Sequence, residues 1–262
     1  MPTILSLTGL AFSNSVPTLP RTRLYPLEFR REKERFKGGL ALVFDDPPSS
    51  LHELAGDILG KVEAAYFSTL HFAPRQKSYL FGRYAAKLVL SDLTSEVDLR
   101  AIEIVRGVFE QPIVHCRHNP GLSVTITHTG SLAMALAYPT GHPCGIDVEV
   151  MSPSRYQTIL SQLSEQEKKW LETSLGDEHE IATAIWAAKE ALSKVLTTGL
   201  MSPMQVYNLA EFNKLESRTW EGLFENFAQY KVKVWLGSSY AFSVAFPKRS
   251  VLDLNDDLCA VL

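Results

Sequence analysis

The chain has few cysteines, and they form no recognisable pattern. Three occur in 262 residues, at Cys116, Cys144 and Cys259, and they are odd in number and far apart. Because no CxxC or Cys/His spacing accompanies them, the sequence predicts neither a disulfide nor a zinc site. Free thiols are typical of a reducing cytoplasm, and we expect the protein to be cytoplasmic.

An excess of positive charge is also missing. The 26 basic and 29 acidic residues give a formal net charge of −3. Domains that bind nucleic acid usually carry a basic surface, so we expect no nucleic-acid partner. Long apolar runs are absent as well: residues 3–12 are far shorter than the roughly 20 residues that span a bilayer. With no positively charged segment before them, these residues predict an N-terminal strand and no membrane segment.

Apolar residues with helical spacing follow a segment of different character. Residues 13–50, rich in Pro, Ser and Arg, predict loops and short strands. The spacing beyond them predicts helices within residues 51–70 and over residues 79–90. Alternating strands come next and end in a hairpin whose turn is Thr129-Gly130-Ser131.

This order of helix and hairpin occurs twice. Residues 84–90 (YAAKLVL) align with 186–192 (WAAKEAL), and residues 131–139 (SLAMALAYP) align with 239–247 (SYAFSVAFP). The two similar offsets indicate a duplicated unit. We therefore expect an α+β fold of two similar helix-plus-antiparallel-sheet units related by a pseudo-twofold axis, with residues 1–142 in the first and 143–262 in the second.

Two acids follow the first hairpin in the segment Gly145-Ile146-Asp147-Val148-Glu149. Because strand side chains alternate between faces, Asp147 and Glu149 share one face. Two neighbouring carboxylates repel each other unless a cation lies between them. In isolation, the same pattern is equally typical of the solvated face of an edge strand.

A second charged group lies 37 residues beyond Glu149, on the predicted helix that begins the second repeat. Trp186, Glu190 and Lys194 are spaced i, i+4 and i+8, so they share one side of that helix, with Lys189 near its edge. Without the other motifs, the spacing of Glu190 and Lys194 would favour the interpretation that they form an ordinary solvated ion pair on the helix surface. Trp186 is expected to pack the helix against the sheet. Combined with the acid strand, the helix provides three carboxylates and two lysines, which suit a divalent metal and a polyphosphate.

The repeats also differ in their polar residues. The first hairpin has His128 where the second has Leu236, and the first helix has Leu88 where the second has Glu190. Polar residues are therefore divided between the hairpin of one unit and the helix of the other. We predict one site at the interface between the units, because sites commonly lie between such units.

The ordered motifs resemble those of the 4′-phosphopantetheinyl transferases in their longer, pseudo-dimeric Sfp-type form. The similarity extends over roughly residues 60 to 247 and rests on four segments: Gln111-Pro112, Ile126-Thr127-His128-Thr129-Gly130, Gly145 to Glu149, and Trp186 to Lys194. Each motif is short, but the four occur in family order. The resemblance implies a monomer that transfers 4′-phosphopantetheine from coenzyme A to a serine of an acyl or peptidyl carrier protein, with release of adenosine 3′,5′-bisphosphate.

The resemblance also implies roles for individual residues. Asp147, Glu149 and Glu190 would bind Mg²⁺, a hard cation that prefers oxygen ligands. Glu190 is the candidate general base, directly or through a water, and Lys194 would stabilise or protonate the leaving group. The residues expected to contact coenzyme A are Arg83, Lys87, Gln111, Thr127, His128, Lys189 and Lys194.

The sequence departs from the family pattern at several positions. Gln111 stands where many relatives have lysine, so its contact with coenzyme A would be a hydrogen bond and not a charge pair. Thr127 replaces the commoner serine, and Ala187 and Ala188 replace larger or hydroxyl-bearing residues. None of these changes removes a predicted metal ligand.

Two other functions remain open. The first is a carrier-binding or catalytically degenerate relative that binds coenzyme A without transfer. The second is a different Mg²⁺-dependent enzyme that acts on a nucleotide pyrophosphate. Because all three acids and both lysines are present, the sequence favours the transferase. Carrier contacts are expected in residues 151–163 and 196–204, for carriers of polyketide, peptide or fatty-acid synthesis.

Overall fold

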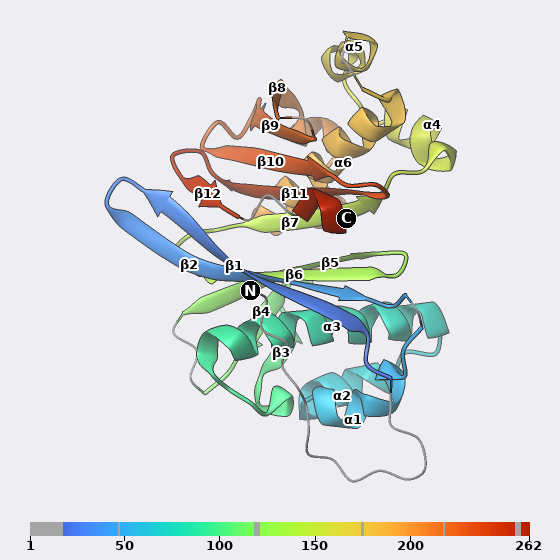
Figure 1. The fold of residues 1–262 in the computed structure, drawn as a ribbon, viewed down its shortest axis with the longest axis vertical. Helices are drawn as coiled ribbons and strands as arrows, with labels where there is room; N and C mark the ends of the chain where they lie inside the picture. The colour runs from blue at the N-terminus through green and yellow to red at the C-terminus, as the bar shows by residue number, and fades with distance from the viewer. Residues whose placement is uncertain (1–17, 47, 118–120, 174–175, 217, 255–257) are drawn as a thin grey trace. The chain divides into compact units, whose positions relative to one another are not determined.

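The computed structural model describes residues 18–46, 48–117, 121–173, 176–216, 218–254 and 258–262 (Figure 1). The α+β fold class is confirmed. The chain divides into two compact units, the first of residues 1–27, 37–107 and 112–139, and the second of residues 28–36, 108–111 and 140–262. The strand predicted at residues 3–12 lies outside the described residues.

A long helix covers a sheet in the first unit. Helix α3 (Ala73–Thr94) contacts strands β5 (Leu122–Thr129) and β6 (Leu132–Pro139). The sheet continues from β6 to β2 (Glu34–Phe44) and then β1 (Arg21–Arg31), although the joined ends of these two strands, residues 28–36, are assigned to the second unit. The smaller elements are η1 (Leu51–Leu54), α1 (Ala55–Ile58), α2 (Lys61–Phe67), η2 (Leu99–Ala101), β3 (Glu103–Arg106) and β4 (Pro112–His115).

The prediction of loops and short strands for residues 13–50 was wrong for much of this segment. Strands β1 and β2 are each 11 residues long. Tyr25, Leu27 and Phe29 are buried at alternate positions of β1, which is the period of a half-buried strand. The charged residues 30–35 contain the turn, where Glu32 has a φ of 53°. Pro and Arg on a strand obscured the alternation in the sequence.

The second unit has the same kind of core. Helix α6 (Glu178–Val195) contacts β7 (Gly145–Val150), β10 (Tyr230–Leu236) and β11 (Tyr240–Pro247). The sheet order is β7-β11-β10-β9-β8, with β9 at Thr219–Phe224 and β8 at Leu209–Glu216. The remaining elements are η3 (Pro153–Arg155), α4 (Tyr156–Leu160), α5 (Glu165–Thr173), η4 (Gly199–Met201), η5 (Met204–Tyr207), β12 (Val251–Asp253) and α7 (Leu258–Val261).

Both predicted hairpins are present, and their registers are equivalent. His128 pairs with Ala133 in the first, and Leu236 pairs with Ala241 in the second. Each residue of the second pair lies 108 positions after its counterpart in the first. The repeat seen in the sequence is therefore a repeat of strand register. Across the described part of the chain, no helix is both long and apolar enough to cross a membrane.

Candidate functional site

A close approach of α6 to β7 forms the centre of the candidate site. A Cβ atom on Gly145 would lie 2.1 Å from the carbonyl oxygen of Ala191 and 2.8 Å from the amide nitrogen of Val195. Ser243 of β11 donates a 2.7 Å hydrogen bond to the carbonyl of Ala187 on α6. Glycine at position 145 and small residues on α6 thus bring the helix backbone against the acid strand.

Asp147 forms an ion pair with Lys194 across this contact. Lys194 Nζ lies 2.8 Å from Asp147 Oδ1, and the Asp147 side chain is buried. The pair joins β7 to the last turn of α6. Two residues that were singled out from separate segments of the sequence therefore meet in the structure.

Glu149 has two hydrogen-bonding partners, and the sequence pointed to neither role. The Arg155 guanidinium donates from both Nη atoms to the carboxylate, with Nη2 3.3 Å from Oε1. Trp186 Nε1 donates to Glu149 Oε1 at 3.0 Å. Trp186 also packs against the apolar core, as expected, so it has a structural role and additionally orients an acid. Arg155 had one sequence signal: it is the only charged residue among positions 151–163.

Glu190 lies close enough to the other two acids to be affected by their charges. Burial and the charge of Asp147 raise the pKa of Glu190 to about 7, with a smaller contribution from Glu149. Lys194 and Arg155 act in the opposite direction. The structure thus groups Asp147, Glu149, Glu190 and Lys194, and adds Arg155 to them.

Lys189 donates its hydrogen bonds to residues outside this group. Its side chain is fully buried and donates to Glu167 Oε2 at 2.6 Å, Asn208 Oδ1 at 2.9 Å and the Gln162 carbonyl at 3.3 Å. These three bonds match the three protons of an ammonium group. Burial lowers the pKa of Lys189, and the charge of Glu167 opposes that effect. The geometry gives Lys189 a structural role, in contrast to the phosphate contact expected from the sequence.

Lys87 and Arg83 of the first unit are also turned inward. Lys87 Nζ lies 2.5 Å from Glu63 Oε2 and donates to the Leu99 carbonyl at 2.8 Å. Arg83 Nε lies 3.5 Å from Glu63 Oε1, and its guanidinium lies over the Tyr79 ring. Both expected substrate contacts are thus engaged with a buried acid.

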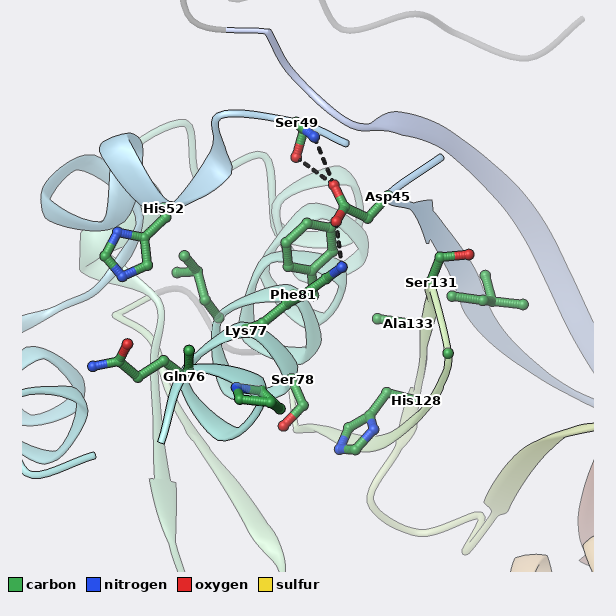
Figure 2. A pocket seen from close by; sticks show the side chains of 15 residues that line it. Asp45, Ser49, His52, Gln76, Lys77, Ser78, Phe81, His128, Ser131 and Ala133 are labelled. Atoms are coloured by element: carbon green, nitrogen blue, oxygen red, sulfur yellow. Dashed lines mark hydrogen bonds and ion pairs between the residues drawn. The ribbon is translucent and has the colours of Figure 1, made fainter. Parts of the chain in front are cut away.

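A pocket of about 670 Å³ lies within the first unit (Figure 2). His128 lines it together with residues of α3, among them Ser78 and Phe81. Lys77 also lines the pocket and forms an ion pair with Asp45 at 2.5 Å. The pocket is therefore lined by two histidines, His52 and His128, and by Lys77; His52 and Lys77 were not identified from the sequence.

Thr127 and Gln111 have different surroundings from His128. Thr127 is buried and, as the neighbour of His128 on β5, points to the opposite face of the strand. Gln111 Oε1 accepts a 2.9 Å hydrogen bond from the Phe109 amide, so its carbonyl end is engaged within its own loop.

The acid cluster fits a divalent cation in its chemistry. Three carboxylates supply the oxygen ligands that Mg²⁺ prefers, and the raised pKa of Glu190 means that a nearby positive charge would stabilise its ionised form. Asp147 and Glu149 are turned toward basic partners, Lys194 and Arg155. Within the described ranges, no three His, Cys, Asp or Glu side chains are arranged to hold a metal ion. Binding would therefore require a rearrangement of these ion pairs.

One comparison with known proteins gives a family match. Residues 143–245 match the model of the 4′-phosphopantetheinyl transferase superfamily. The match covers less than half of the chain, and it includes both β7 and α6. No curated protein matched the sequence.

Proposed function

We propose that this protein transfers 4′-phosphopantetheine from coenzyme A to a serine hydroxyl of an acyl or peptidyl carrier protein in a Mg²⁺-dependent reaction. The observation that carries the proposal is the grouping of Asp147, Glu149, Glu190 and Lys194 within the segment that matches the transferase superfamily. In the reaction, the serine oxygen bonds to the β-phosphorus of coenzyme A. The bond from this phosphorus to the bridging oxygen breaks, and adenosine 3′,5′-bisphosphate leaves.

The residues of the cluster have separate roles in this proposal. Asp147, Glu149 and Glu190 would hold Mg²⁺, which when bound neutralises charge on the pyrophosphate. Lys194 lies beside Asp147 and can stabilise or protonate the departing oxygen. Glu190, with a pKa near neutrality before ligands bind, is suited to accept the serine proton, directly or through water.

The pocket of the first unit that His128 lines is the proposed location of the nucleotide part of coenzyme A. His128 and Lys77 can donate to phosphate oxygens, and Phe81 offers an aromatic surface. We do not assign phosphate contacts to Lys87, Lys189 or Arg83, because each is itself buried and paired with a buried acid. Lys77 is also paired with a buried acid, Asp45, but its side chain is 47% exposed and can reach a ligand in the pocket. Thr127 and Gln111 remain proposed contacts of coenzyme A.

Mass spectrometry of a carrier protein tests the proposal directly. Apo carrier proteins of polyketide, peptide and fatty-acid synthesis are incubated with coenzyme A, Mg²⁺ and the protein. We expect the serine of at least one carrier to gain the mass of phosphopantetheine, and we expect no gain with Asp147→Ala. Failure across all carriers would overturn the transferase proposal, and coenzyme A binding without transfer would indicate a binding module.

A further inference from the structure

Arg155 has an unusual position for a lone charged residue. It ends the 3₁₀ helix η3, which starts three residues after β7, and it is the only charge in the segment 151–163. Both Nη atoms engage the Glu149 carboxylate. The Arg155 side chain is 42% exposed, whereas that of Glu149 is 13% exposed. A partly exposed guanidinium thus reaches inward to a largely buried acid.

The charges of the cluster show what Arg155 does there. Asp147, Glu149 and Glu190 contribute three negative charges when ionised, and Lys194 and Arg155 contribute two positive charges, which leaves −1. The guanidinium also interacts electrostatically with Asp147 and Glu190. Arg155 therefore supplies the neutralisation that a divalent cation would supply. A dication bound by Glu149 would face a positive charge at hydrogen-bond distance from the same carboxylate.

We infer that Arg155 is a displaceable counter-ion: it is held by Glu149 in the ligand-free protein and turns to the pyrophosphate of coenzyme A when Mg²⁺ takes its place. This inference rests on the proposed function. Guanidinium binds carboxylate and phosphate with the same two-pronged geometry, so the exchange replaces one bidentate partner with another. The partial exposure of the Arg155 side chain leaves room for that movement.

Lys194 is less suited than Arg155 to leave its carboxylate and turn to the pyrophosphate. Its ammonium group binds the more deeply buried Asp147, and its side chain is only 26% exposed. A single ammonium also lacks the paired donors of guanidinium. Displacement of Arg155 has a thermodynamic consequence: Mg²⁺ and coenzyme A should bind with positive coupling, because each favours the same Arg155 position.

Calorimetric titrations of the full chain with Mg²⁺ and with coenzyme A test the inference. For Arg155→Gln, we expect Mg²⁺ alone to bind roughly fivefold more tightly, because a repulsive charge is gone. With Mg²⁺ present, coenzyme A should bind about tenfold more weakly, because a charged phosphate partner is lost. Arg155→Lys keeps the charge, so its Mg²⁺ affinity should stay near that of the unmodified protein while coenzyme A still binds more weakly.

A matched control is Arg35→Gln. Arg35 pairs with Glu28 at 2.7 Å in the β1–β2 hairpin, so this change removes an arginine–glutamate pair in which neither residue belongs to the acid cluster. It should alter neither affinity, and circular dichroism checks that each variant is folded. If Arg155→Gln binds Mg²⁺ no more tightly while the unmodified protein still transfers phosphopantetheine, the inference is overturned and the proposed function stands. If the unmodified protein neither binds Mg²⁺ with coenzyme A nor modifies a carrier, both fail.

Discussion

The two helix-and-sheet units each contain a buried Lys–Glu ion pair, but only the second carries the carboxylates of the acid cluster. Lys87 pairs with Glu63 in the first unit, and Lys189 pairs with Glu167 in the second. Each glutamate also accepts a hydrogen bond from the amide three residues before it, at Gly60 or Ser164. Each accepts another from a strand or its edge, at Ile104 or Leu209. This Lys–Glu clamp thus ties three elements together in both units.

Equivalent positions of the two sheets and helices show where the units diverge. In the first unit, β2 pairs with β6 through Ala41–Ala135 and Val43–Ala133. In the second, β7 pairs with β11 through Asp147–Ser243 and Glu149–Ala241. Since β6 and β11 match at an offset of 108, Ala41 and Val43 correspond to Asp147 and Glu149. Leu88 likewise corresponds to Glu190.

The comparison separates scaffold from candidate chemistry. A buried Lys–Glu pair that occurs in both units serves the fold common to both. Carboxylates that occur in one unit, at positions where the other has apolar residues, are not needed for that fold. The same repeated sequence, YAAKLVL and WAAKEAL, therefore contains a structural lysine followed by either a core leucine or a candidate site acid.

The most direct test of this difference is to give the second unit the apolar residues that the first unit has at the equivalent positions. The triple variant Asp147→Ala, Glu149→Val, Glu190→Leu should lower carrier modification by about 10³-fold or more, because it removes every proposed metal ligand. Thermal unfolding should show a fold that is at least as stable. Glu180→Gln, on the same helix, is the control. Retention of a tenth of the activity by the triple variant would contradict the assignment of these acids.

The clamp predicts a large effect on stability in both units. Lys87→Met and Lys189→Met should each lower the free energy of unfolding by about 3 kcal/mol, because each leaves a buried carboxylate without its partner. Urea unfolding measures the loss. Lys168→Met, which removes an exposed partner of Glu165, should change little.

Lys189→Met also decides between the structural and the phosphate-binding roles of this lysine. At a temperature where the variant is folded, coenzyme A should bind with unchanged affinity if Lys189 acts only through the clamp. A loss of affinity without a loss of stability would instead restore the phosphate contact that the family resemblance implies.

The comparison also shows how far the sequence could predict the site. Strand alternation placed Asp147 and Glu149 together, and i, i+4 spacing placed Glu190 beside Lys194. These local patterns could not predict where the Lys189 side chain points, because Glu167, the partner of Lys189, comes from another helix, 22 residues away. A signal was present in Ser164-Glu165-Gln166-Glu167, which has the S-x-x-E pattern of a capping box. That pattern fixes the position of Glu167, and the buried acid then requires a cation.

The fold was predictable to a similar extent. Helix α3 and both hairpins followed from periodicity, whereas the predicted helical segment at residues 51–70 is divided into η1, α1 and α2. Gly60 caps the last of these and would place a Cβ atom 2.5 Å from Glu103. This close approach depends on a strand 43 residues away, so local spacing could not reveal the break.

Glu190 predicts a pH dependence that Leu88 cannot show. The pKa of Glu190 is raised to about 7 in the folded protein, so its protonated form stabilises the fold at pH below about 4.5. That contribution is lost as pH rises through about 7. Relative to the unmodified protein, Glu190→Gln should therefore gain roughly 2 kcal/mol in unfolding free energy between pH 4.5 and pH 8.5. Urea unfolding at both pH values, with Glu180→Gln as the control, measures the difference; an equal effect at both would contradict the raised pKa.

The smallest effect is expected where the repeats carry different aromatic residues. Trp186 donates to Glu149 and corresponds to Tyr84, which is buried in the core of the first unit. Trp186→Phe keeps an aromatic ring but removes the donor that orients the carboxylate, so Mg²⁺ affinity in the presence of coenzyme A should fall about fivefold. Tyr84→Phe is the matched change in the first unit and should leave that affinity unchanged. Because both variants retain a packed ring, calorimetry can attribute a selective loss in Trp186→Phe to the indole hydrogen bond; equal losses would instead assign the effect to packing.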